Sequence, residues 1–386
     1  MQRLGLTAAQ LRAYHDTLRS SHERRIVVQI QTLGGRVLTS QQVDVIDGGI
    51  TVDTDAEVTR VLSMVFVDPS RSIRFETNDP SGVPLHRSRR IEVHYEVRVP
   101  ALDRWVTAVP FSGPIWDYRR QGAEVTIVAH GMDRQGLGNQ WSARTFGKKS
   151  RKTRAIRTVL GDIGFEEMSI PDLKRTFPGR FTVARLDQPL PKLRRVARSL
   201  DRHLFIDGPG VPRMRAIPNR PVFTFDDRSL VAEPSIRRTT EELKNVAEVL
   251  GGKPKGAKRR VRAVAQLRPN HPLSPESLSF NGKPLRLVER VENPHLKTTA
   301  DCKKRARRIR DERAKLPVEH GFEAVPVPHL DELDLVRVVT ADGPVVIRMK
   351  QWSLPLGGSA AGGTGGQPMT VGSLKRVSRT GGGRRR

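Results

Sequence analysis

Three acidic side chains, Asp53, Asp55 and Glu57, alternate along a stretch with the pattern of a β-strand entry. Alternation in a strand places all three on one face, and hard cations such as Ca²⁺ bind several carboxylate oxygens together. A calcium loop with this spacing would need Gly at position 58 and Glu at position 64, where the chain has Val58 and Met64. We therefore expect no metal here, and interpret the three carboxylates as polar residues that contact a neighbouring subunit.

Two further patterns resemble reactive sites but lack necessary residues. Gly131 and Gly136 have the spacing of a phosphate-binding loop, but Leu137 and Gly138 replace the Lys and Ser/Thr that hold phosphate and magnesium. Cys302, the single cysteine, lies among cations that could lower its thiol pKa. The positions of the histidines in the sequence do not identify one that could act as its catalytic partner. No structural-zinc spacing and no pair of acid/base carboxylates occurs in the sequence. We expect no catalytic residues, no cofactor and no metal.

Basic residues outnumber acidic ones by 68 to 41, which gives the chain a formal charge of +27 at pH 7. They concentrate at residues 144–198, 253–262 and 303–315 and in the last dozen residues. A charge this large predicts contact with a polyanion or an acidic protein. The densest cluster lies on a predicted helix and has six members: Lys303, Lys304, Arg305, Arg307, Arg308 and Arg310.

These six cations leave three interpretations open. They could contact DNA phosphates non-specifically, with the salt dependence that counterion release imposes, face an acidic protein, or form a solvated helix surface. Aromatic residues make up 5% of the chain and none is interleaved among the six cations at 303–310, which disfavours stacking on single strands there. No zinc-finger or RNA-recognition signature accompanies them, so we expect no sequence-specific recognition.

Residues 50–69 are the stretch around which we expect the fold to be organised. From Val61 onward apolar residues occupy both odd and even positions, so a strand here would bury both faces within an assembly. About seven short strands precede residue 130 without helical crossovers, which predicts an antiparallel barrel or sandwich. Its cleanest strand, at residues 91–99, alternates apolar with polar residues.

The remaining pattern predicts a mainly β protein with an α+β insert. Thr7 and Gln10 form a capping box for an N-terminal helix within residues 1–22. We expect a first β domain at residues 23–135, which residues 221–250 could complete, and an α+β insert at 136–220 with two helices. The later segments are a second β domain at 251–356 and a flexible Gly- and Arg-rich tail at 357–386. The second β domain contains the basic helix 299–316, whose expected apolar side is Cys302, Ala306, Ile309 and Leu316.

No apolar run approaches the roughly 18 residues that a membrane-spanning helix needs, and no secretory signal opens the chain. With one cysteine the chain cannot form an internal disulfide. We therefore expect a soluble protein.

The order of these features is similar to that of the minor tail proteins of long-tailed actinobacteriophages, the baseplate hub or tail-associated proteins. The resemblance spans most of residues 24–356. Residues 357–386 and the high basicity lie outside it. It is carried by residues 48–69, 90–99, 111–114, 203–208, 272–275, 281–282, 326–334 and 351–356.

The resemblance implies a structural virion protein, made in the host cytoplasm, with two tail-tube-like β-barrels and an inserted α+β domain. It implies a homotrimer at the tail tip, in which two barrels in each of three chains continue a sixfold tube. Expected partners are the distal tail or tail tube protein, other tip proteins and the tape-measure protein. Two alternatives remain: a non-specific nucleic-acid-binding protein, and a cell-wall-degrading tail enzyme, against which the missing catalytic signature argues.

Overall fold

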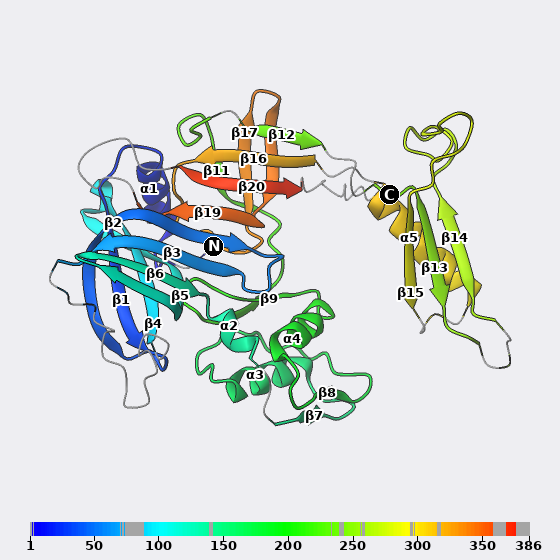
Figure 1. Cartoon of the computed structure of the whole chain (residues 1–386), viewed down its shortest axis with the longest axis horizontal. Coiled ribbons are helices and arrows are strands. Elements are labelled where there is room, and N and C mark those ends of the chain that lie inside the picture. The colour runs from blue at the N-terminus through cyan, green and yellow to red at the C-terminus, as the bar shows by residue number, and fades with distance from the viewer. Residues whose placement is uncertain are drawn as a thin grey trace. The chain divides into compact units, whose positions relative to one another are not determined.

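The chain forms two compact units, each described here by itself. In this computed structural model the first unit contains residues 1–235 and 320–386, and the second contains residues 236–319. Strands predominate in both units, as the sequence predicted (Figure 1). The structure describes residues 2, 4–69, 71, 73, 89–138, 142–232, 234–238, 243–254, 256, 259–293, 296, 298–314, 318–357 and 368–375.

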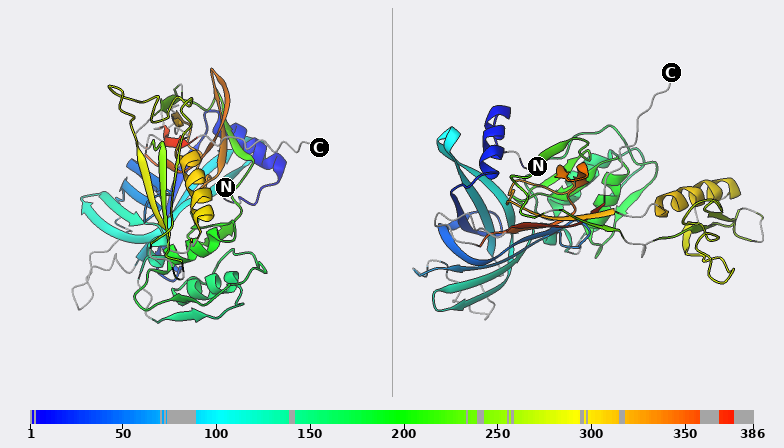
Figure 2. Two further views of the ribbon diagram at one scale, coloured as in Figure 1. Left: turned by 90° about the vertical axis from the view of Figure 1, so that its right-hand side faces the viewer. Right: turned by 90° about the horizontal axis from the view of Figure 1, so that it is seen from above.

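Six antiparallel strands of the first unit pair in a closed cycle, called here the six-strand ring. β1 pairs with β2 and β4, β3 with β2 and β6, and β5 with β4 and β6, so each strand has two neighbours within the ring. Their curvature is visible from two further directions (Figure 2). The strands are β1 (Arg24–Thr32), β2 (Val37–Asp53), β3 (Arg60–Val67), β4 (Arg89–Val99), β5 (Arg104–Gln121) and β6 (Glu124–His130), with a 3-10 turn, η2 (Pro100–Leu102), between β4 and β5.

Two positions in the two longest strands require glycine. β5 changes partner from β4 to β6 near Gly113, where an added Cβ would lie 1.9 Å from the His130 carbonyl oxygen. Gly48 lies within the pairing of β2 with β3, where its φ is 105° and an added Cβ would lie 2.1 Å from the Ser63 carbonyl oxygen. A side chain at either position would collide with the backbone of the neighbouring strand.

The strand predicted to bury both faces buries only one. Leu62, Met64 and Phe66 of β3 are fully buried, whereas Val61 and the other odd-numbered valines of this strand are half-buried. The even positions face the inside of the six-strand ring and the odd positions its outer surface. The prediction concerned an assembly, and within the single chain β3 is covered on its inner face and partly covered on its outer face. The alternation predicted for β4 is confirmed.

A second group of strands extends the six-strand ring. β19 pairs with β2, from Gln351 opposite Asp53 to Pro355 opposite Gly49, and the sheet continues through β20, β16 and β12. β11 pairs with β17 in parallel, and β17 with β18 in a hairpin. The members are β11 (Pro221–Phe225), β12 (Ser235–Arg238), β16 (Val318–Ala324), β17 (Leu335–Thr340), β18 (Gly343–Arg348), β19 (Gln351–Pro355) and β20 (Met369–Lys375).

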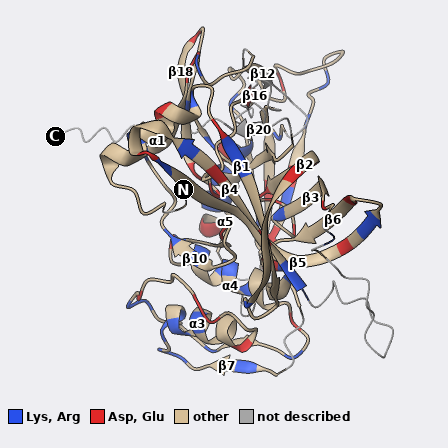
Figure 3. Ribbon diagram, turned by 90° about the vertical axis from the view of Figure 1, so that its left-hand side faces the viewer, with Lys and Arg blue, Asp and Glu red and all other residues tan. Residues whose placement is uncertain are grey.

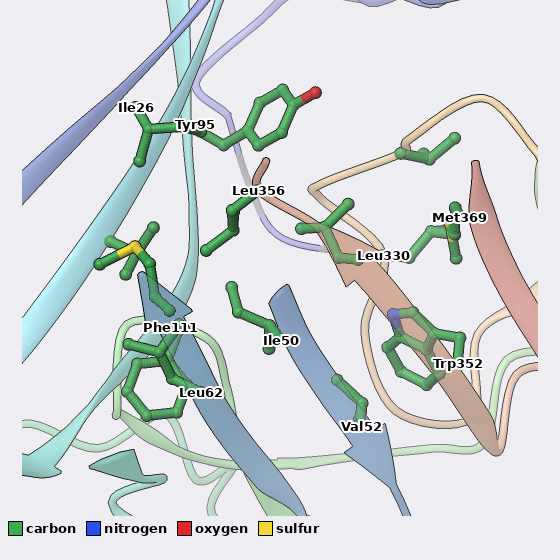
Figure 4. Close-up of a cluster of buried hydrophobic side chains, with 14 of the residues drawn as sticks. Ile26, Ile50, Val52, Leu62, Tyr95, Phe111, Leu330, Trp352, Leu356 and Met369 are labelled. Carbon is green, nitrogen blue, oxygen red and sulfur yellow. The ribbon is translucent and has the colours of Figure 1, made fainter. Parts of the chain in front are cut away.

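One hydrophobic cluster joins the ring to this second group. Ile50 and Val52 of β2, Trp352 of β19 and Met369 of β20 lie in the same buried cluster as Leu62 (Figure 4). The structure thus differs from the predicted division, because β16–β20 pack with the first unit and the six-strand ring closes without residues 221–250.

Part of the predicted flexible tail is ordered, because β20 pairs with β19 and buries Met369 and Val371. Residues 358–367 and 376–386 of that tail lie outside the described residues. The N-terminal helix α1 (Ala8–Leu18) begins with the predicted capping box between Thr7 and Gln10.

The α+β insert has a hydrophobic cluster of its own. Leucine, valine and isoleucine side chains of α3 and α4 form its centre, with Phe165 and Phe177 around them. The elements are α2 (Asp133–Gly136), β7 (Arg144–Phe146), α3 (Lys152–Asp162), β8 (Phe181–Val183), α4 (Pro189–Arg198), β9 (His203–Ile206) and β10 (Pro212–Arg215).

The second unit is a three-stranded sheet with one helix on its face. The central strand β13 (Val246–Gly251) pairs antiparallel with β14 (Arg262–Gln266) and parallel with β15 (Val288–Asn293). Helix α5 (Thr299–Arg313) packs on this sheet through Cys302, Ala306 and Ile309, the apolar side that the sequence predicted. Leu316, predicted to extend this side, lies outside the described residues.

Candidate functional site

The basic helix α5 is the first candidate site, and its orientation follows from its cap and its apolar side. Thr298 caps the helix by accepting a hydrogen bond from the Asp301 backbone N–H at 3.1 Å. Near the other end, the Arg310 side chain donates to the Gln266 carbonyl oxygen at 3.1 Å. Because Cys302, Ala306 and Ile309 face the sheet, the lysines and arginines between them point away from it.

The six predicted cations differ in the charged groups that surround them. Arg308 pairs with Glu312 at 3.1 Å and Arg310 with Asp311 at 2.7 Å. The other four, Lys303, Lys304, Arg305 and Arg307, make no ion pair within the described part of the chain. All of these four except Arg305 are exposed. The helix therefore presents a compact group of unpaired positive charges to solvent.

Cys302 lies on the inner face of this helix, away from the exposed cations. Its side chain is completely buried, close to Gly251, where an added Cβ would lie 2.8 Å from the Cys302 Sγ. Burial raises the pKa of this thiol, and Asp301 raises it further. The lowering that neighbouring cations could have caused is not observed, so this cysteine serves packing.

The three acidic residues at positions 53–57 belong to a hairpin loop. Asp53 ends β2 and its side chain accepts a hydrogen bond from the Asp55 backbone N–H at 2.9 Å, which turns the chain towards β3. Asp55 forms an ion pair with Lys350 at 3.2 Å, and the Gln188 amide donates to Glu57 at 3.5 Å. The prediction that these residues share one strand face was wrong, because this turn interrupts the expected strand.

A buried group of ion pairs, which sequence analysis did not identify, joins the six-strand ring to the loop at residues 326–334. The Arg60 guanidinium at the start of β3 contacts Asp331 at 2.6 Å, and their side chains are 4% and 2% exposed. Arg60 also donates to the Pro110 carbonyl oxygen at 3.2 Å. Since charges are costly to bury unless they are paired, this interaction fixes the loop against β3 and β5.

The same acidic loop contacts the insert. His203 of β9 lies 3.1 Å from Glu332, and Arg215 of β10 lies 3.0 Å from Asp334. Glu332 and Asp334 are almost completely buried, and burial raises the pKa of Asp334. The loop therefore holds the ring and the insert together. The feature of the sequence that could have indicated this loop is three acidic residues within four positions, Asp331, Glu332 and Asp334, in a mostly apolar segment.

A pair of histidines holds α1 against the loop at residues 326–334. The Nε2 atoms of His15 and His329 are 3.0 Å apart, and Phe223 of β11 packs edge-on against His15. One ring nitrogen must donate and the other accept, so the pair forms only while at least one ring is neutral. Burial lowers the pKa of His15 to about 4, with a further lowering from Arg19, and burial also lowers the pKa of His329 well below its ordinary value.

We expect this pair to make the first unit less stable in mild acid. Both folded-state pKa values lie below the ordinary value of 6.5, so the stabilisation is complete above pH 6.5 and declines as pH falls towards 4. Urea unfolding at pH 7, 6 and 5 measures the decline. The double variant His15→Gln/His329→Gln should show a shallower dependence on pH over this range. An unchanged slope in the double variant would assign the effect to other groups.

Within the described ranges no group of three or more His, Cys, Asp or Glu side chains is arranged to hold a metal ion. No helix in the described part of the chain is both long and apolar enough to cross a membrane.

Known solved structures share this fold over nearly the whole chain. A 43 kDa tail protein of prophage MuSo2 from Shewanella oneidensis aligns with 91% of this chain and 98% of its own, at 14% identity and a TM-score of 0.56. A tail protein from Neisseria meningitidis aligns with 91% of this chain and 96% of its own, at 13% identity and a TM-score of 0.56. One chain of the lidded Francisella PdpA–VgrG complex aligns with 95% of this chain and 54% of its own, at 10% identity and a TM-score of 0.50.

No known family and no curated protein sequence matches the chain. At these low identities the structural matches establish the fold, which is that of prophage tail proteins.

Proposed function

We propose that this chain is a structural protein of a phage tail tip, a hub that connects the tail tube to the distal host-binding apparatus. The observation that carries the proposal is that the fold of the tail proteins extends over 91% of the chain and is not confined to one domain. On this proposal the protein resides in the virion tail and performs no chemistry.

The arrangement of strands supports two tail-tube-like barrels in each chain. The first is the six-strand ring, and the second consists of β11, β12 and β16–β20, with β13–β15 and α5 inserted in the sequence between β12 and β16. Pairing of β19 with β2 connects the two directly. In a homotrimer, two barrels per chain give six, which matches a sixfold tube.

The proposed partners are the distal tail or tail tube protein, the other tip proteins and the tape-measure protein. Contact with another subunit would cover the outer face of β3, whose valines are half-buried in the single chain. The exposed carboxylates of Asp55 and Glu57 remain candidates for subunit contact, alongside the bonds that they form within the chain.

Immunogold labelling of intact virions tests the location. The proposal requires label at the tail tip. Label on the capsid or along the tail shaft would contradict it, and hydrolysis of purified cell wall by the chain would contradict its non-enzymatic role.

Non-specific binding to DNA is a second candidate function, favoured by the unpaired cations of α5. The variant Lys303→Gln/Lys304→Gln/Arg307→Gln is expected to weaken retention on duplex DNA at low salt and to reduce the salt slope by about 0.9 for each phosphate that is no longer neutralised. A matched control is Arg290→Gln, which removes one exposed arginine from β15, outside α5. Gel-shift series at several salt concentrations measure both effects. No retention of the unaltered chain at low salt would eliminate this function.

A further inference from the structure

A pocket in the α+β insert combines aromatic rings with cations that are far apart in the sequence. It lies among α3, α4, β8 and the residues just before β8, and its volume is about 320 Å³. Lysines and arginines recur along α3, α4 and β7 of the insert (Figure 3). We call it the insert pocket.

Two phenylalanines form the apolar part of the insert pocket. The rings of Phe177 and Phe181 stack 4.8 Å apart with 6° between their planes, and Phe146 packs on Phe181 from another side at 6.3 Å. Phe177 is buried, and Phe181 is half-buried at the pocket wall. Rings held in place on other rings offer a fixed surface to a planar group.

Three cations line the same pocket. Lys152 at the start of α3 donates to the Ser199 hydroxyl at 2.8 Å and lies 5.9 Å from the centre of the Phe177 ring. Lys192 pairs with Asp187, whereas Arg195 is exposed and has no ion-pair partner in the described ranges. Like charges around one hollow repel each other, and a bound anion would relieve this repulsion.

We propose that the insert pocket binds a phosphate ester that carries a single ring, of the size of a pyrimidine nucleotide. Phosphate oxygens would accept hydrogen bonds from Arg195 and Lys152, and the base would pack against the phenylalanines. The volume is at the lower end of the range for ligand pockets, which suits a ligand with one ring. The ligand is either a free nucleotide or one unit of a single strand.

This inference does not depend on the role in the tail, because the pocket lies within the insert and needs no second subunit. Sequence analysis disfavoured base stacking at the six cations of α5, which have no aromatic residue among them. The insert differs, because Phe177 and Phe181 line the same pocket as Lys152 and Arg195.

Isothermal titration of the full chain with cytidine 5′-monophosphate tests the proposal, with an expected Kd of about 0.1–1 mM. Cytidine, ribose 5-phosphate and inorganic phosphate should each bind at least about tenfold more weakly, because each lacks either the base or the phosphate. The dinucleotide pdCpdC distinguishes a free nucleotide from one unit of a single-stranded nucleic acid. Tighter binding than the mononucleotide indicates a single-stranded nucleic acid, and equal or weaker binding indicates a free nucleotide.

Three variants connect the binding to the pocket. Arg195→Gln and Lys152→Gln should each weaken nucleotide binding about tenfold, since each removes a charged hydrogen bond. Arg198→Gln changes an exposed arginine on the same helix that does not line the pocket, and should leave binding unchanged. No nucleotide binding at about 10 mM, or an equal loss in all three variants, would overturn the proposal. The thermal melting of each variant shows that it is folded.

Discussion

Replacing Gly113 by alanine is expected to lower the free energy of unfolding of the first unit by about 3 kcal/mol. The added Cβ would lie 1.9 Å from the His130 carbonyl oxygen and 2.8 Å from its carbonyl carbon. Both are backbone atoms of the paired strand β6, so no side-chain rotation can relieve the collision. β5 would have to separate from β6 at the point where it turns between β4 and β6.

Urea unfolding followed by tryptophan fluorescence measures this loss, because Trp105 and Trp116 both lie in β5. The matched control is Gly34→Ala in the turn between β1 and β2, where an added Cβ has no neighbour closer than 3.9 Å. It should change stability by less than about 0.5 kcal/mol. Equal effects of the two substitutions would show that the corner at Gly113 tolerates a side chain and that the geometry of the ring is incorrect.

The second large effect concerns the buried ion pair between Arg60 and Asp331. Asp331→Asn keeps the shape of the side chain but leaves the Arg60 charge buried without a counter-charge, at a cost of about 3–5 kcal/mol. The double variant Arg60→Met/Asp331→Leu should recover most of that loss, since replacing both charges with apolar groups removes the unpaired charge.

Asp55→Asn is the control for this prediction, because it weakens an exposed ion pair with Lys350 and should cost less than about 1 kcal/mol. The same urea series measures all three proteins. If Asp331→Asn were as mild as Asp55→Asn, the loop at residues 326–334 would not hold the ring and the insert together. A double variant less stable than Asp331→Asn would show that the pair itself stabilises the fold.

Local sequence patterns predicted which helices and strands form better than they predicted which strands pair. Alternation at residues 91–99 and the capping box at Thr7 depend on neighbours in sequence, and both are confirmed. The pairing of β19 with β2 joins residues about 300 positions apart, and no local pattern indicates it. The predicted division at residues 251–356 therefore differs from the observed one, because β16–β20 belong with the first unit and β13–β15 with the second.

The candidate sites could likewise be predicted only where their residues are close together in the sequence. The six cations of α5 were identified from one run of sequence, and the structure adds which of them are unpaired. Arg60 and Asp331 are 271 positions apart, so their ion pair depends on the complete fold. The insert pocket likewise needs two helices and a strand to bring Lys152, Phe181 and Arg195 together.

The mass of the purified chain mixed with the distal tail protein of the same phage tests the proposed hub most directly. Native mass spectrometry should detect a complex that contains three copies of this 43.2 kDa chain. A chain that remains monomeric and binds no tail component would contradict the hub.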